Sequence, residues 1–216
     1  MIDMYNVPYE PKFYISLSGL DGSGKTTQAK LLNQSMTNLQ LNSIVCHHRI
    51  TDNTFFKKAF SYIYTNKIIE NISQDDMSLF IAFELLGYYL SLDDNKNVVP
   101  IFDRWIFDLF VSQTTIFNSD FKKGMLLLKN LLSYGCNIFI DVPPDICAKR
   151  IFERGEIIKS HESYEVLVKK YLKYKELEHK GAFIVVDGTE DCQCIHEKIL
   201  NVVINKIEEM SNLKIM

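Results

Sequence analysis

The sequence has no long apolar run, no marked excess of either charge and no cysteine pattern that would hold a metal. No apolar stretch approaches the ~18 residues that a membrane span needs, so we expect no membrane partner. Lys and Arg number 24 against 27 Asp and Glu, which argues against nucleic-acid binding and favours a small-molecule partner. The five cysteines are scattered, and Cys192-x-Cys194 lacks the second pair or the histidines of a zinc site, so we expect reduced thiols.

Targeting signals and domain linkers are not evident either. Residues 1–12 carry Asp3, Glu10 and two prolines but no apolar core, so we expect neither a signal peptide nor a transit sequence, and a cytoplasmic location. No Gly/Ser-rich stretch or repeat divides the chain. A length of 216 residues suits one sizeable core, and we therefore expect a single domain over residues 1–216.

Strand-like and helix-like segments alternate along the chain. This alternation predicts an α/β fold, a doubly wound five-stranded and mostly parallel sheet flanked by helices, with ligands at the carboxyl ends of the strands. Pro100 conflicts with the third strand, because proline removes a donor from the hydrogen-bond ladder. The expected strands are 13–18, 43–50, 97–102, 136–142 and 182–187; the expected helices begin near Lys25, cover 54–65, 74–92, 105–117, 121–133 and 145–153, and resume near Asp191.

A glycine-rich segment joins the first strand to the first helix. It reads Gly19-Leu20-Asp21-Gly22-Ser23-Gly24-Lys25-Thr26, which fits the pattern G-x-x-x-x-G-K-[ST]. The glycines allow successive backbone N–H groups to surround an anion, and the helix N-terminus adds its positive dipole. The pattern predicts binding of ATP and Mg²⁺, with a chance glycine turn as the alternative. The expected nucleotide-binding residues are Gly19, Gly22, Ser23, Gly24, Lys25, Thr26 and Thr27, with Lys25 on the β- and γ-phosphates and Thr26 on Mg²⁺.

The loop, extended by Thr27-Gln28, resembles that of thymidylate kinases. Three further segments resemble parts of this family in the same order along the chain. Phe102 to Trp105 resembles its Asp-Arg-Tyr motif, and Ile138 to Pro144 resembles its fourth strand. Arg154-Gly155 and His161 to Glu165 resemble its lid. The resemblance implies a P-loop kinase domain with a short lid over about residues 150–165. It also implies ATP-dependent transfer of a γ-phosphoryl group to a nucleoside monophosphate. In this family the acceptor is dTMP.

The resemblance also implies roles in catalysis. Arg104 would grip the acceptor phosphate with its planar fork, and Asp21 would orient the acceptor sugar or assist the transferring phosphate. Because Gly22 stands where some family members carry an arginine, Arg150 and Arg154, four residues apart, are the candidates to close over that phosphate. For Arg150 an exposed ion pair is the alternative.

Metal and acceptor contacts follow from the same resemblance. Asp103 would hold Mg²⁺ directly or through water together with Thr26, and a structural ion pair is its alternative. Gln113 falls where the family often places a glutamine that contacts the base. Tyr164 falls where the family has a tyrosine that contacts the sugar.

The acceptor side departs from the family. The run Arg49 to Thr54 lacks the family's proline and its phosphate-binding arginine, so Arg49 is the substitute candidate, with His47 or His48 assisting. Phe80 keeps a phenylalanine that stacks on thymine, whereas Glu84 replaces an arginine that donates to O4. An ionised carboxylate only accepts hydrogen bonds, so Glu84 favours a base with an exocyclic amine, or turns away to pair with a lid arginine. In addition, Ser163 stands where the family usually has an arginine, and Asp108 stands where it usually has a serine.

Two other functions compete with this interpretation. A deoxynucleoside kinase shares the loop and the Asp-Arg pair, but it usually needs a carboxylate base after the second strand, where His47-His48-Arg49 stands. The second competing function is that of a catalytically weak relative that only binds nucleotide. The aromatic stripe from Phe102 to Phe110 is expected to be core, with Trp105 and Phe80 as site candidates. Apolar helices at 77–92 and 125–132 predict a possible homodimer.

Overall fold

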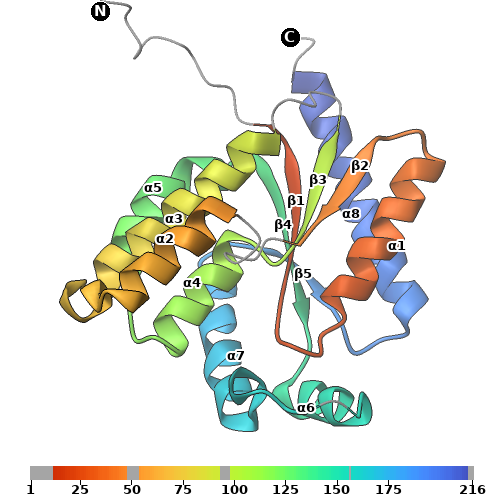
Figure 1. Ribbon diagram of the computed structural model, residues 1–216. Helices are drawn as coiled ribbons and strands as arrows, with labels where there is room; N and C mark the ends of the chain where they lie inside the picture. Colours follow the sequence, from red (N-terminus) through yellow and green to blue (C-terminus); the bar gives the residue numbers. More distant parts are fainter. Residues whose placement is uncertain (1–11, 48–53, 93–97, 156, 214–216) are drawn as a thin grey trace, which may run out of the picture.

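The computed structural model describes residues 12–47, 54–92, 98–155 and 157–213, which form a parallel sheet covered by helices (Figure 1). The strand order is β2-β3-β1-β4-β5, and every neighbouring pair is parallel. This confirms the predicted doubly wound, five-stranded sheet. The strands are β1 (Tyr14–Ser18), β2 (Ser43–Cys46), β3 (Val99–Asp103), β4 (Gly135–Asp141) and β5 (Ile184–Asp187).

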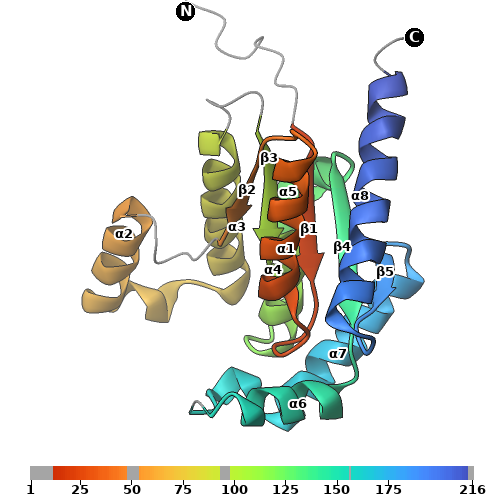
Figure 2. The same ribbon diagram turned by 90° about the vertical axis from the view of Figure 1, so that its right-hand side faces the viewer.

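Helices cover both faces of the sheet. In two perpendicular views α1 and α8 lie on one face, and α3, α4 and α5 lie on the other (Figures 1 and 2). Among the described residues, no helix combines the length and apolar character needed to cross a bilayer. The helices are α1 (Lys25–Asn38), α2 (Thr54–Thr65), α3 (Gln74–Ser91), α4 (Ile106–Thr115), α5 (Lys122–Leu132), α6 (Pro144–Glu153), α7 (Tyr164–His179) and α8 (Cys192–Leu213), with 3₁₀ turns η1 (Ile68–Asn71) and η3 (Ser160–Glu162).

The core consists of two clusters of buried apolar residues, and the larger one includes residues from both faces of the sheet. All five residues of β1 are buried, as expected for the central strand of a sheet that is covered on both faces. Leu32 and Met36 of α1 belong to one cluster, and Phe102 and Trp105 belong to the cluster beneath α3 and α5. The rings of Phe102 and Trp105 stack with their centroids 3.6 Å apart, which confirms that the aromatic stripe serves mainly as core.

Pro100 lies at the beginning of β3, where its missing N–H is tolerated. The backbone N–H of Val99 bonds to Asn42 on the β2 side, so alternation along the strand directs the nitrogen of Pro100 toward β1. Pairing between β3 and β1 begins one residue later, at Ile101. The proline therefore displaces no ladder bond to β1, which resolves the conflict in the sequence.

The carboxyl ends of the strands meet at the edge of the sheet beside α6 (Figure 2). Asp103, Asp141 and Asp187 end β3, β4 and β5 there. Asp141 pairs with Lys175 at 3.0 Å, and Asp187 accepts a hydrogen bond from the backbone N–H of Thr189 at 2.9 Å. These two carboxylates serve the structure, which leaves Asp103 as the strand-end acid next to the glycine-rich loop.

Candidate active site

The glycine-rich loop turns sharply between β1 and α1, and Gly22 allows that turn. Its φ is +88°, and a Cβ at this position would lie 2.7 Å from the carbonyl oxygen of Cys147. Any side chain would therefore force the loop away from α6. The same close contact excludes an arginine at this position without a rearrangement, so cations other than Lys25 must reach the loop from other elements.

Lys25 begins α1, and its ammonium group lies inside the loop. The group is buried and donates to the carbonyl oxygens of Gly19, at 2.8 Å, and Leu20. Burial first, and then the nearby Arg104 guanidinium, lower the pKa of Lys25 to about 8 against the opposing effect of neighbouring carboxylates. When phosphate oxygens enter the loop, the Lys25 ammonium group can donate to them in place of these carbonyl oxygens, because the lysine side chain is flexible.

Thr26 and Asp103 bring two oxygen ligands together beside the loop. The Thr26 hydroxyl donates to Oδ2 of Asp103, and Nδ1 of His47 lies 3.2 Å from the same oxygen. Oδ1 of Asp103 is buried and has no hydrogen-bond partner among the described residues. Hydroxyl and carboxylate oxygens suit Mg²⁺, which usually takes its remaining ligands from water and phosphate. The pair fits that ion, and no group of three or more His, Cys, Asp or Glu within the described ranges forms a separate metal site.

Arg104 follows β3 in a left-handed backbone conformation, with φ at +75°. Non-glycine residues adopt this conformation at a cost and persist in it where the surroundings fix them, often at functional sites. Its guanidinium pairs with Oδ1 of Asp21 in the loop. Burial alone would raise the pKa of Asp21, but Arg104, Lys25 and Lys170 hold it well below its usual range. Asp21 is therefore a carboxylate surrounded by cations.

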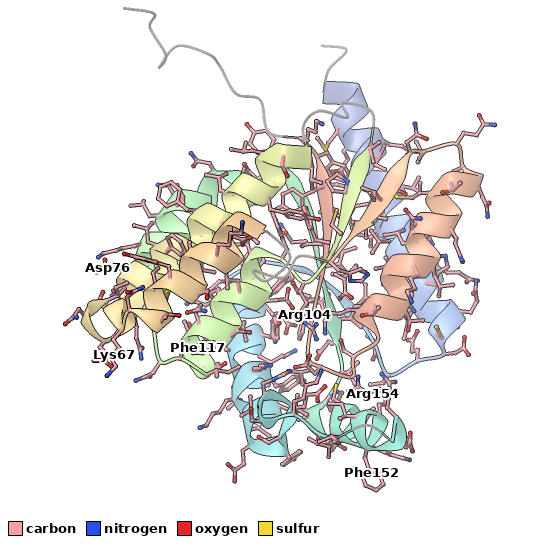
Figure 3. All side chains as sticks on the ribbon, in the orientation of Figure 1. Lys67, Asp76, Arg104, Phe117, Phe152 and Arg154 are labelled. Carbon is pink, nitrogen blue, oxygen red and sulfur yellow. The ribbon has the colours of Figure 1, made fainter. Side chains whose placement is uncertain are left out.

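A large open cleft of about 1250 Å³ runs along the loop. Arg150 and Arg154 both line it; Figure 3 shows Arg154 beside α6 and Arg104 nearer the strand ends. Arg150 donates to the carbonyl oxygen of Gly188 at 3.1 Å, and Arg154 pairs with the buried carboxylate of Glu162 at 3.0 Å. Each predicted lid arginine thus faces the cleft while held by one contact on its rim.

The start of α8 forms another part of the rim of the cleft. Cys192 lines the cleft with an exposed thiol, and its carbonyl oxygen accepts from Gln28 of α1 at 2.9 Å. Of the five cysteines, all of which are free, only Cys192 and Cys194 are exposed. This contact ties the helix that follows the loop to the helix at the far end of the chain.

A second, smaller cavity of about 210 Å³ opens between α3, α4 and α7. Glu84 lines it and is fully buried, and Trp105 and Ile81 contribute apolar walls. Asp108 also lines it, and its carboxylate accepts from the hydroxyls of Ser18 and Tyr174, each at 2.7 Å. The cavity therefore combines an apolar wall with a few fixed polar groups, as small-molecule sites commonly do.

Several predicted acceptor residues lie elsewhere. Gln113 is buried in α4 and is not among the described residues that line either cavity, although its neighbour Ser112 lines both. Phe80 is half-buried on α3, where Ile81 and Glu84 line the smaller cavity instead, and Tyr164 is 55% exposed at the start of α7. Arg49 lies outside the described residues.

Comparison with known proteins places the chain in a family. The family model for thymidylate kinase matches residues 17–199, which is most of the chain. The chain belongs to the thymidylate kinase family. A thymidylate kinase of Sulfurihydrogenibium sp. (strain YO3AOP1) is 29% identical over 209 residues, covering 88% of this chain and 95% of the relative. A probable thymidylate kinase of Methanosarcina mazei is 26% identical over 214 residues, covering 91% of this chain and 98% of the relative.

Membership of the thymidylate kinase family makes the chain a nucleoside monophosphate kinase. The matched range contains the loop, Asp103, Arg104 and both lid arginines. The site also contains two residues that sequence analysis missed, Lys170 and Tyr174 of α7, which line the smaller cavity. Their signal was the apolar and polar stripe Leu167, Lys170, Tyr174 and Leu177 at helical spacing, all buried in α7.

Proposed function

We propose that this chain transfers the γ-phosphoryl group of ATP to a pyrimidine nucleoside monophosphate that carries an exocyclic amine. The observation that carries the acceptor class is the fully buried Glu84 on the wall of the smaller cavity. An ionised carboxylate accepts from an amine and repels a carbonyl oxygen. The alternative of a pair between Glu84 and a lid arginine has less support, because Arg154 pairs with Glu162 and Arg150 with Gly188.

In this proposal the larger cleft takes ATP and the smaller cavity takes the acceptor. Lys25 and the backbone N–H groups of the loop bind the β- and γ-phosphates, and Thr26 and Asp103 hold Mg²⁺. When bound, Mg²⁺ offsets phosphate charge during transfer. An oxygen of the acceptor phosphate attacks the γ-phosphorus, and the bond to the bridging oxygen of ADP breaks. Arg104 and the lid arginines stabilise the charge that shifts between the two nucleotides.

Turnover of a nucleotide panel tests this proposal. ADP release is measured with dTMP, dUMP, dCMP and CMP, and with the nucleosides thymidine and deoxycytidine. We expect dCMP or CMP to exceed dTMP in kcat/KM by about tenfold to a hundredfold. In Glu84→Gln this preference should shrink, because an amide both donates and accepts. Glu70→Gln, an exposed change on η1, is the matched control and should keep the preference.

Other outcomes of the panel identify the competing functions. A clear preference for dTMP that Glu84→Gln leaves unchanged would contradict the amino-bearing acceptor and leave a dTMP kinase. Turnover of nucleosides alone would indicate a deoxynucleoside kinase. Nucleotide binding without any turnover would indicate the catalytically weak relative.

We also propose a two-fold homodimer through the outer face of α3. Helices α3 and α5 pack on each other, yet Phe83 and Leu90 remain 53% and 39% exposed. Gly87 lies between them on the same face, with open space where its Cβ would be. A glycine in the middle of a helix costs about 1 kcal/mol relative to alanine, a cost that close approach of a second helix would explain. The cytoplasmic location remains a prediction.

A further inference from the structure

The two cavities meet at a small set of residues. Four described residues line both of them: Asp21, Arg104, Ser112 and Lys170. If the cleft takes ATP and the smaller cavity takes the acceptor, the phosphoryl group must cross between them at this junction. Lys170 is the charged member of the set that no motif indicated, and it comes from α7, 149 residues beyond Asp21 in the chain.

The ammonium group of Lys170 is held inside the junction. Its side chain is 9% exposed, and Nζ donates to Oδ2 of Asp21 at 2.9 Å and to the carbonyl oxygen of His161 at 3.3 Å. An ammonium group has three N–H donors. Within the described part of the chain these two bonds leave one donor for a phosphate oxygen at the point where the cavities join.

Three cations from separate elements meet at or beside the junction. Arg104 pairs with Oδ1 of Asp21 and Lys170 with Oδ2, and the buried ammonium group of Lys25 lies in the same loop. Asp103 and Asp108 add two further negative charges that act on Arg104 and Lys25. Phosphoryl transfer needs cations that converge on the migrating group from different parts of the chain, and Lys170 is one of these three.

Helix α7 fixes the position of Lys170. Tyr174, one turn further along, donates to Asp108 at 2.7 Å, and its ring stacks on that of Phe139 with centroids 5.1 Å apart. The helix is thereby anchored to the core, while His161, which Lys170 also contacts, belongs to the segment predicted as the lid. Lys170 therefore links the lid to the loop from a rigid element.

We propose that Lys170 is a catalytic residue whose ammonium group contacts the phosphoryl group in transit. This assignment rests on the proposed function. The oxygen of the acceptor phosphate bonds to the γ-phosphorus as the bond to ADP breaks, and Lys170 forms no covalent bond in this step. Before transfer it pairs with Asp21; during transfer its remaining donor stabilises the oxygens of the migrating group.

The test compares Lys170→Met, Lys170→Gln and Lys170→Arg with the exposed neighbour Lys169→Met as control. Lys170→Gln keeps a donor for the His161 carbonyl, so it removes the charge with less disturbance than Lys170→Met. We expect kcat to fall about a hundredfold to a thousandfold in both neutral variants. The dissociation constant for ATP alone, measured by calorimetry, should change by less than about threefold. Lys170→Arg should recover part of kcat, and Lys169→Met should match the wild type.

Three results would overturn the assignment. The first is a neutral variant with wild-type kcat. The second is a loss of activity that follows only the unfolded fraction in thermal melts, which would make Lys170 structural. In both cases an active wild type leaves the proposed function standing. The third is a wild-type chain that turns over no monophosphate, which would overturn the proposed function and the Lys170 assignment together.

Discussion

The protonation of Lys25 should control how ATP affinity changes with pH. Its pKa of about 8 in the free protein means that the group is charged and attracts phosphate at lower pH and becomes neutral above that value. We therefore expect the dissociation constant for ATP to rise as the pH passes 8, and binding above that pH to take up a proton. Calorimetry in buffers of different ionisation enthalpy measures both quantities.

Lys25→Arg is the matched control for this pH dependence. A guanidinium group stays charged across this pH range. The ATP affinity of Lys25→Arg should therefore stay constant as the pH passes 8, whereas the affinity of the wild type falls. An equally steep fall in the arginine variant would assign the titration to another group.

At Gly22 the backbone conformation and the neighbouring carbonyl both disfavour a side chain. We expect Gly22→Ala to lower the free energy of unfolding by more than the ~1–2 kcal/mol that a left-handed alanine costs by itself, and to weaken ATP binding. Gly155→Ala isolates the backbone cost, because its φ is +68° and nothing lies within 4 Å of a Cβ there. Urea unfolding compares the two variants; equal losses would show that the contact with Cys147 is unimportant.

At the scale of single elements, a buried hydrogen bond from Tyr174 helps to hold α7 against the core. Tyr174→Phe keeps the ring on Phe139 but removes the donor to Asp108. We expect the free energy of unfolding to fall by about 1–3 kcal/mol, because a buried carboxylate loses a partner. Tyr134→Phe removes a hydroxyl from a 38% exposed residue and should change that free energy by less than about 0.5 kcal/mol in the same urea titration.

Most elements were predictable because their signals are local. The range 54–65 matched α2 at both ends, and α3 and β1 matched to within a residue at each end. Helix α7 was missed because the lid resemblance ends at about residue 165, and the helical spacing of Leu167, Lys170, Tyr174 and Leu177 beyond it was not used. The third strand was placed too early, since the sequence does not show where pairing with β1 begins.

The site divides in the same way. The glycine-rich loop and the strand-end pair Asp103 and Arg104 could be read from the sequence because each is a short continuous motif. The contact between Lys170 and Asp21 could not, because it depends on how α7 folds back onto the loop. Which helix faces line the smaller cavity is also a tertiary property, and this is why Ser112 lines it while Gln113 does not.

At the scale of the whole molecule, the proposed homodimer depends on the exposed face of α3. Phe83→Asp places a charge in the middle of that face and should convert the dimer to a monomer. Sedimentation equilibrium measures the change, and Leu126→Asp on α5, a residue that is 67% exposed, is the control. A wild-type chain that sediments as a monomer at micromolar concentration would contradict the proposal.

The exposed thiols offer a practical route to watch this protein at work. Three of the five sulfhydryls lie in the interior, so a maleimide dye should attach at Cys192 and Cys194, and Cys194→Ser would confine it to the rim of the larger cleft. Fluorescence from that position should respond when a nucleotide arrives. The native chain thus carries its own attachment point for an optical binding assay, without an engineered cysteine.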